Sequence, residues 1–278
     1  MPTPTTETGA DPEVEVGSGW ITSMQHGKLS FTVLTLAGYV DLLCNGKFNC
    51  GHWIFRGVED SERHQLVPTI GRMAAYRTED GKFSEIAESE LLNDFKRRSR
   101  GVLAVTPSNN WEWLAIAQHH GLPTRLLDWS MSPLTGLWFA TRPKLNGDGS
   151  LDQADADAAV YALHVCDYLD TEGKTGPFDV ASHGLFVAPH VTSRIRLQAG
   201  VFTVQPNPLI PFEEQPPSDR GFELIKIRIA KAGIAAIQKA LYVSGIRHST
   251  LFPEIDGIAN ELRYRGVFTD NHSICPSA

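Results

Sequence analysis

The sequence predicts an α+β fold in a single domain, with a split sheet of mixed or antiparallel strands flanked by helices. Apolar segments of strand length and segments with helical spacing follow one another irregularly, without the β-α-β rhythm that is typical of a parallel sheet. The chain has 278 residues, of which 42% are hydrophobic, and this is enough for one sizeable core. No internal repeat is visible.

The ordered domain is expected to span residues 19–270. Residues 1–18 are rich in Thr, Pro, Glu and Gly, a composition that predicts a disordered tail because it buries little apolar surface. A second flexible tail is expected at 271–278. Inside the domain, an acidic loop is predicted at 146–158 and a proline-rich connector at 206–218.

Strands are predicted where short apolar runs end at glycine or proline. Helices are predicted where apolar side chains recur every three or four residues between capping residues. In chain order, the expected elements are a helix at 37–44, a strand at 51–57, helices at 84–98 and 109–120, a strand at 124–129, a helix that starts near Pro133, strands at 160–165 and 222–229, a helix at 231–243 and a last helix that ends at Arg263.

The helix at 109–120 has the clearest boundaries. Asn109 and Glu112 stand three residues apart, as in a capping box. Gly121 suits the left-handed position that ends many helices. Pro123 cannot continue a helix, so the chain is expected to leave as a strand.

The formal net charge of −7 argues against a protein that coats nucleic acid or anionic membrane non-specifically. No apolar run approaches the length of a membrane span. The first residues lack the basic start and the apolar stretch of a signal peptide. A cytoplasmic protein without a membrane partner is therefore expected.

Four cysteines are too few for a disulfide framework in a chain of this length. Cys44, Cys50 and His52 lie close in sequence, but their spacing fits no common zinc pattern and no second pair of ligands follows. No metal cofactor is therefore expected.

The segment QHHGLPTRLLDW at 118–129 is predicted to be the chemical centre of the protein. It concentrates polar side chains beside leucine and tryptophan, and burying polar groups is costly unless each finds a partner. The segment is therefore either a rigid polar network or the wall of a ligand pocket. His119 and His120 have a second interpretation, since imidazoles at a helix end stabilise its last carbonyl groups. Arg125 and Asp128 could likewise form a structural ion pair.

Arg56 ends an apolar strand, between Phe55 and Gly57. A guanidinium held there by rigid backbone offers a planar fork that suits phosphate or carboxylate. A salt bridge to Asp128 or Asp256 is the alternative. Neither a P-loop nor a GxGxxG phosphate loop occurs in the sequence.

Five segments stand out as motifs along the chain. They are FRG at 55–57, LVPTIGR at 66–72, QHHGLPTRLLDWSMSPLTGLWFA at 118–140, RIRLQAGVFT at 194–203 and LFPEIDG at 251–257. In this order they resemble the successive motifs of the FRG domain family, and the resemblance covers roughly residues 35–265.

Arg56, the DWS motif that contains Ser130, and Glu254 follow one another in a second recognisable order. It is similar to the order of key residues in ADP-ribosyltransferases of the R-S-E class. This resemblance implies that Arg56, with Gly57, grips the diphosphate of NAD and that Ser130 or Thr124 holds the nicotinamide ribose. Glu254 would hydrogen-bond the ribose 2′-hydroxyl and stabilise the oxocarbenium-like transition state.

The last motif departs from that class, because it reads Glu254-Ile-Asp256 in place of a Glu-x-Glu pair. Asp256 is therefore an alternative to Glu254 as the key acid. Both carboxylates also fit a simpler role, since acids at a helix N-terminus are stabilised by the helix dipole. The middle motif reads DWSMS where Ser-Thr-Ser is expected.

The resemblance places further side chains at the nucleotide. The candidate catalytic residues are Glu254, Arg56, Ser130 and His119, and the candidate cofactor-binding residues are Arg56, Gly57, Gln118, His120, Thr124, Arg125, Asp128, Gln198 and Asp256. Gln198 would reach a base or sugar, with an ordinary buried amide as the alternative.

The function expected from these motifs is an NAD-binding, ADP-ribosyltransferase-like enzyme that transfers ADP-ribose to a macromolecule or hydrolyses NAD. NAD or a related nucleotide is then the substrate, and a protein or nucleic acid is the acceptor. This function requires Arg56, His119 or His120, Ser130 and Glu254 to converge on one cleft.

Two other functions fit the same residues. In the first, His119 and His120 are the acid and base of a metal-independent hydrolase or nuclease, with Arg125 at the phosphoryl transition state. In the second, Arg56 and Arg125 belong to a non-catalytic module that recognises a nucleotide or phosphate in a bacterial defence or toxin system.

Overall fold

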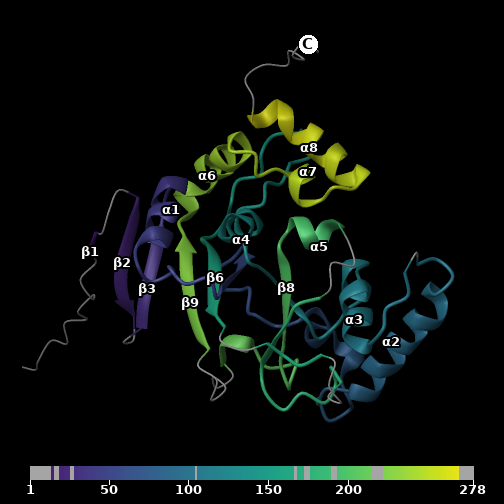
Figure 1. Cartoon of the computed structure of the whole chain (residues 1–278). Helices are drawn as coiled ribbons and strands as arrows, with labels where there is room; N and C mark the ends of the chain where they lie inside the picture. Colours follow the sequence, from purple (N-terminus) through teal and green to yellow (C-terminus); the bar gives the residue numbers. More distant parts are fainter. Residues whose placement is uncertain are drawn as a thin grey trace, which may run out of the picture.

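The computed structural model describes residues 14–15, 19–25, 28–103, 105–165, 168–171, 176–188, 193–214 and 222–268. Its strands are β1 (Val14–Glu15), β2 (Trp20–Gln25), β3 (Lys28–Val33), β4 (Trp53–Val58), β5 (Leu127–Ser130), β6 (Ala158–His164), β7 (Gly184–Phe186), β8 (Gly200–Val204) and β9 (Glu223–Ile229). They form one continuous sheet in the order β1-β2-β3-β9-β6-β4-β5-β8-β7 (Figure 1). The predicted α+β class with a mixed sheet is confirmed.

Neighbouring strands are antiparallel except β3 and β9, which are parallel with Phe31 opposite Ile227. All of β4 pairs with β6. Between β4 and β5, by contrast, a single pair is in register, Phe55 with Ser130. The two strands therefore separate beyond this pair. The residues after Phe55 and before Ser130 border a gap in the ladder.

Helices cover the sheet in two groups. The helices are α1 (Leu36–Cys44), α2 (Glu85–Ser99), α3 (Asn110–His119), α4 (Pro133–Ala140), α5 (Ser193–Leu197), α6 (Lys231–Val243), α7 (His248–Leu251) and α8 (Ile255–Phe268), with 3-10 turns η1 (Thr69–Arg72), η2 (Ala74–Tyr76) and η3 (Phe212–Glu214). Buried side chains of α1, α4 and α6 form one core cluster with β3, β9, β6 and β4. Helices α2 and α3 lie together beside β8 and contribute to a second cluster (Figure 1).

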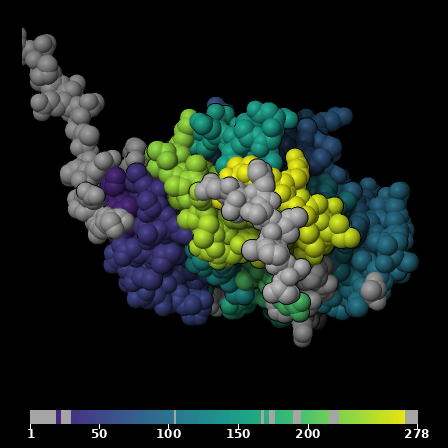
Figure 2. Space-filling model, turned by 90° about the horizontal axis from the view of Figure 1, so that it is seen from above, coloured from purple at the N-terminus to yellow at the C-terminus, as the bar shows by residue number. Residues whose placement is uncertain are grey.

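The C-terminal helices lie on top of the molecule, where α8 rests against α6 (Figure 2). The rings of Tyr242 on α6 and Phe268 on α8 are 5.1 Å apart. A third apolar cluster fills the opposite face of the sheet, around Trp129 and Tyr161. There the backbone N–H of Phe212 in η3 donates to the Leu66 carbonyl at 3.0 Å, so two irregular segments cover a face that carries no long helix.

Gly57 allows α4 to pack directly on β4. A Cβ atom at this position would lie 2.1 Å from the carbonyl oxygen of Gly136, far inside contact distance. A Cβ atom added to Gly136 would likewise lie only 2.8 Å from the Cβ of Phe55. The glycine of the Phe-Arg-Gly triplet therefore has a packing role, and it fixes the height of α4 above the strand that carries Arg56.

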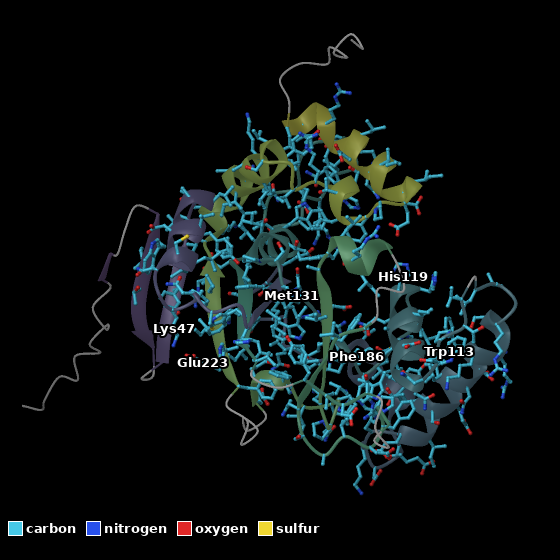
Figure 3. The ribbon with its side chains drawn as sticks, viewed as in Figure 1. Lys47, Trp113, His119, Met131, Phe186 and Glu223 are labelled. Carbon is cyan, nitrogen blue, oxygen red and sulfur yellow. The ribbon has the colours of Figure 1, made fainter. Side chains whose placement is uncertain are left out.

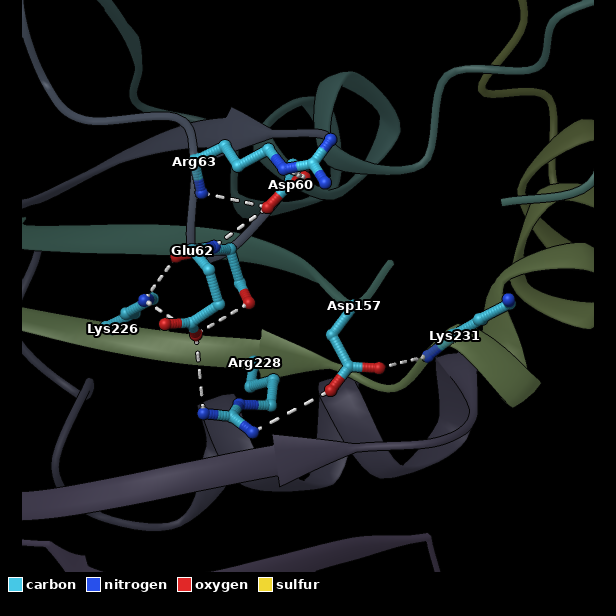
Figure 4. A network of polar contacts seen from close by, with 8 residues as sticks. Asp60, Glu62, Arg63, Asp157, Lys226, Arg228 and Lys231 are labelled. Atoms are coloured by element: carbon cyan, nitrogen blue, oxygen red, sulfur yellow. Dashed lines mark hydrogen bonds and ion pairs between the residues drawn. The ribbon is translucent and has the colours of Figure 1, made fainter. Parts of the chain in front are cut away.

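A network of surface ion pairs ties the loop after β4 to β9 and α6 (Figure 4). Glu62 contacts Lys226 and Arg228 at 3.6 Å each, and Arg228 also contacts Asp157 at 3.7 Å. Asp157 accepts a hydrogen bond of 2.8 Å from the backbone N–H of Lys231, the first residue of α6. Because the N-cap residue of α6 supplies no side-chain bond of its own, Asp157 satisfies this helix end from a neighbouring segment.

Most predicted elements have counterparts in the structure, with two kinds of difference. The strand predicted at 124–129 is shorter, because Thr124 Oγ1 accepts from the Leu126 N–H in a local turn and β5 begins only at Leu127. Strands β1, β2, β3, β7 and β8 and the short helices α5 and α7 have no counterpart among the predicted elements. Apart from Val14–Glu15, both predicted tails lie outside the described residues, and so does 215–218 of the proline-rich connector. Within the described part of the chain, every helix is too short or too polar to cross a membrane.

Candidate functional site

A cavity of about 250 Å³ lies at the gap between β4 and β5. It is lined by Phe55, Arg56, Gly57, Ala115, Gln118, His119, Asp128, Trp129, Ser130, Phe139, Ile195, Gln198, Gly200, Val201 and Phe202. The complete Phe-Arg-Gly triplet belongs to this wall. All three apolar clusters supply part of the lining, so the cavity lies where the separate parts of the core meet.

Arg56 is the central cation of the cavity. Its Nη1 donates to the Asp128 carbonyl at 2.6 Å and lies 3.8 Å from the Asp128 carboxylate. The guanidinium therefore bridges β4 and β5 where their ladder stops. Its Nε is buried and has no hydrogen-bond partner among the described residues. A buried donor without a partner is costly, and an anionic ligand in the cavity could remove that cost.

The charges around Arg56 oppose one another. Burial lowers the pKa of Arg56, the Asp128 carboxylate raises it, Arg72 lowers it and Glu213 raises it. Arginine stays protonated in proteins despite such shifts. The Asp128 side chain is 63% exposed whereas that of Arg56 is 21% exposed, so the pair presents a cation inside the cavity and an anion at its rim.

Ser130 and Gln198 form another part of the cavity wall. Ser130 Oγ donates to the Gln198 carbonyl at 2.6 Å and accepts from the Ser132 N–H at 2.9 Å. The Gln198 amide donates from Nε2 to the Leu251 carbonyl at 3.0 Å. The Ser130 hydroxyl therefore both donates and accepts a hydrogen bond within the protein. The Gln198 amide connects the cavity wall to the segment that precedes Glu254.

The end of α3 supplies the third side of the cavity. His119 is the last residue of α3 and lies at the end of this helix that is near α5 (Figure 3), and its ring stands edge-on to that of His120 with centroids 4.8 Å apart. Gln118 Oε1 accepts from the Thr124 hydroxyl. Gly121, with φ of +86°, ends the helix in the left-handed conformation, as predicted. This turn directs His119 toward the cavity, whereas His120 is exposed and borders a separate hollow against α2.

Arg125 does not line the cavity, which corrects the expectation that it contacts a nucleotide. It is fully buried, with Nε and Nη2 at 2.8 and 2.6 Å from Glu88 Oε2 and Nη1 at 3.2 Å from the Pro177 carbonyl. The rings of Phe83 and Phe178 flank its guanidinium. A group enclosed in this way can reach no ligand, so Arg125 joins α2 to the central motif. The same burial removes the phosphoryl-stabilising role of the hydrolase interpretation.

Glu254 and Asp256 also lie outside the cavity lining. Both side chains are exposed. The carbonyl of Glu254 accepts from the Gly257 N–H at 2.9 Å, and Asp256 lies in the first turn of α8. The expected convergence is therefore partial: Arg56, His119 and Ser130 share the cavity, and Glu254 does not line it. Any ligand role of the two acids stays a prediction.

Several lining residues were not among the candidate site residues named from the sequence. Phe139, Ile195 and Phe202 supply apolar surface, and Trp129 is fixed by a 2.8 Å bond from Nε1 to Thr203 Oγ1. Ile195, Val201 and Phe202 belong to the RIRLQAGVFT motif, so the motif could have indicated that these residues lie at the site. Their position depends on the antiparallel pairing of β5 with β8, which no local pattern specifies.

The fold and the cavity thus define an α+β protein with an arginine-centred, ligand-sized site at a break in its sheet. Residues 51–149 match the family model of the FRG domain, so the chain carries an FRG domain in this range. The match includes the Phe-Arg-Gly triplet, α2, α3, β5 and α4. The later motifs at 194–203 and 251–257 lie beyond it. No curated protein and no solved structure matches the chain.

Proposed function

We propose that the cavity binds NAD and that the protein is an ADP-ribosyltransferase-like enzyme, which transfers ADP-ribose to a macromolecule or to water. The observation that carries the proposal is the Arg56 guanidinium, held at the cavity by the Asp128 carbonyl at 2.6 Å with its buried Nε unpartnered among the described residues. Such a donor suits a phosphate oxygen, since charge-assisted hydrogen bonds to phosphate are among the strongest in proteins.

The size and lining of the cavity support a nucleotide. Ligand pockets usually measure roughly 300–1,000 Å³ and combine apolar walls with a few polar groups. At about 250 Å³, this cavity suits a nucleoside-sized part of NAD better than the whole dinucleotide. Phe139 and Phe202 line the cavity and supply aromatic surface for a base. The diphosphate would then lie at Arg56, and the rest of the molecule would extend past Asp128.

In the proposed reaction, the bond between ribose C1′ and the nicotinamide nitrogen breaks, and nicotinamide leaves with the bonding electron pair. The acceptor or a water molecule forms the new bond to C1′ and gives up a proton. Positive charge develops on the ribose in the transition state, and a nearby carboxylate stabilises it. Asp128 is the acid that lines the cavity. We therefore assign this role to Asp128, and Glu254 becomes the comparison residue.

Titration of the purified chain with NAD, combined with chromatographic detection of nicotinamide, tests both parts of the proposal. Saturable binding and nicotinamide release are expected. Arg56→Met should weaken binding by roughly 10-fold to 100-fold, because a hydrogen bond to a charged group contributes about 1.5–3 kcal/mol. Arg263→Met is the matched control, since Arg263 is exposed on α8, does not line the cavity and donates a hydrogen bond to Asn260 in its own helix.

A non-catalytic module that recognises a nucleotide or phosphate is the second candidate. It is favoured by the position of Glu254 outside the cavity lining and by the engagement of the Ser130 hydroxyl with Gln198. This candidate predicts Arg56-dependent binding of NAD or ADP-ribose without any release of nicotinamide. Failure of NAD and ADP-ribose to bind at millimolar concentration would contradict both candidates.

A further inference from the structure

We propose that Cys50, His52 and His164 form a binding site for a divalent cation of the zinc class. Their ligand atoms, one sulfur and two imidazole nitrogens, all lie within 4.8 Å of one another. Cys50 Sγ and His164 Nε2 are 3.2 Å apart. None of the three residues lines the central cavity, so the proposal is independent of the nucleotide site.

The sheet brings the three ligands together from two distant segments. Cys50 and His52 precede β4, and His164 ends β6. The register of these strands places Trp53 opposite His164, and the Val165 N–H donates to the His52 carbonyl at 3.0 Å. The rings of His52 and His164 are perpendicular, with centroids 6.0 Å apart. Backbone pairing therefore fixes the spacing of the site before any metal binds.

The geometry suits tetrahedral coordination. Bond lengths of about 2.3 Å to sulfur and about 2.0–2.1 Å to nitrogen place tetrahedral ligands roughly 3.3–3.6 Å apart. The separation between Cys50 and His164 is close to this, and small side-chain rotations would bring in His52, which is exposed. Three protein ligands leave one position for water or an anion.

The ligand set also selects the class of cation. One thiolate and two imidazoles favour zinc, cobalt, nickel or copper over magnesium and calcium, which prefer oxygen ligands. On binding, the Cys50 thiol loses its proton to solvent.

The charged residue opposite His164 on the neighbouring strand belongs to an ion pair. Glu223 stands opposite His164 in the β6–β9 ladder, and its carboxylate contacts Lys47 Nζ at 2.5 Å. Lys47 and Glu223 mark this end of the sheet in Figure 3. The charges of Glu223 and Lys47 therefore compensate each other at this end of the sheet.

Cobalt titration of the full chain, stripped with a chelator under reducing conditions, tests the site. One equivalent of Co²⁺ should produce a saturable thiolate-to-cobalt charge-transfer band together with the visible bands of tetrahedral cobalt. Cys50→Ser should abolish the charge-transfer band, and His52→Ala or His164→Ala should weaken cobalt binding at least tenfold, in line with the effect of removing metal-site partners. Cys44→Ser is the matched control because Cys44 is also exposed and free but lies outside the cluster.

Zinc should also raise the melting temperature of the unchanged chain and of Cys44→Ser by linkage to the folded state, and it should not raise that of Cys50→Ser. The proposal is overturned if no saturable band appears, if both histidine variants bind cobalt like the unchanged chain, or if Cys44→Ser loses the band. It is also overturned if zinc leaves the melting temperature of the unchanged chain unaltered.

Discussion

Arg56 crosses from β4 to the carbonyl oxygen of Asp128 on β5, 2.6 Å away, at the point where the two strands stop pairing. This contact holds the guanidinium in the break of the sheet that forms the cavity. Arg56 lies within β4, where the buried residues Trp53 to Phe55 before it and the pairing with β6 fix its backbone. Arg56 and Asp128 therefore form one unit, in which each positions the other.

Separate roles for the two candidate acids can be measured. Asp128→Asn is expected to lower nicotinamide release roughly 100-fold to 1,000-fold, the loss typical of a group that stabilises charge in a transition state. Glu254→Gln should leave the rate within about threefold of the unchanged chain, because Glu254 lies outside the cavity lining. The rate of nicotinamide release by each variant, measured by chromatography at saturating NAD, shows which of the two acids stabilises the transition state. The reverse pattern would return the catalytic role to the turn at Glu254.

Gly57→Ala is expected to destabilise the fold, because the new methyl group would meet the Gly136 carbonyl oxygen at 2.1 Å. Backbone atoms on both sides of this contact cannot move aside easily, so a loss of about 1–3 kcal/mol in the free energy of unfolding is expected. Urea unfolding measures it. Gly101→Ala is the control, since a Cβ there meets nothing within 4 Å. Equal stability of the two variants would contradict the proposed packing role.

The buried pair of Arg125 and Glu88 is predicted to be a structural link between α2 and the central motif. Arg125→Met leaves the Glu88 carboxylate, which is 2% exposed, without its cation, so a loss of about 3–5 kcal/mol is expected in urea unfolding. Arg98→Met should cost less than about 1 kcal/mol, because Arg98 is an exposed arginine that is 3.8 Å from Asp94. A small loss for Arg125→Met would show that the pair is dispensable.

The same pair gives a pH dependence with a defined sign. Burial raises the pKa of Glu88 above its ordinary value of 4.5, against the opposing hydrogen bond and charge of Arg125. An acid with a raised pKa in the folded state binds more protons there than in the unfolded state. Its contribution to stability is therefore lost as the pH rises from its unfolded-state pKa through its folded-state pKa.

The free energy of unfolding of the unchanged chain, minus that of Glu88→Gln, should therefore decrease from about pH 4.5 upward. Equilibrium urea unfolding at several pH values measures this difference. An increase with pH would mean that Arg125 outweighs burial at this carboxylate.

Local patterns predicted the longer helices but missed α5 and α7, and α8 continues to Phe268, past the predicted end at Arg263. The helices with the clearest signals are those that carry their own caps. Ser132 caps α4 and Asn109 caps α3, as their residue types favour. Glu112 reaches back to the Ser108 N–H at 2.7 Å, one residue earlier than the capping box predicts. Such contacts lie within one turn of the chain, and sequence spacing is enough to find them.

The site was predictable only in part. Arg56, Gln118 and Asp128 were chosen for chemical reasons, and all three line the cavity. Arg125 was chosen for the same reasons, but its burial depends on Glu88, which is 37 residues away in sequence. His164 joins Cys50 and His52 only through the register of β4 and β6. Long-range pairing decides these outcomes, and residue spacing does not contain it.

Isothermal titration of the unchanged chain, Arg56→Met and Arg263→Met with NAD measures directly whether Arg56 anchors the nucleotide. Saturable binding is expected for the unchanged chain and for Arg263→Met, with affinity reduced roughly 10-fold to 100-fold in Arg56→Met. Circular dichroism should show that both variants remain folded. Equal affinity of NAD for Arg56→Met and the unchanged chain would contradict the claim that Arg56 anchors the ligand in this cavity.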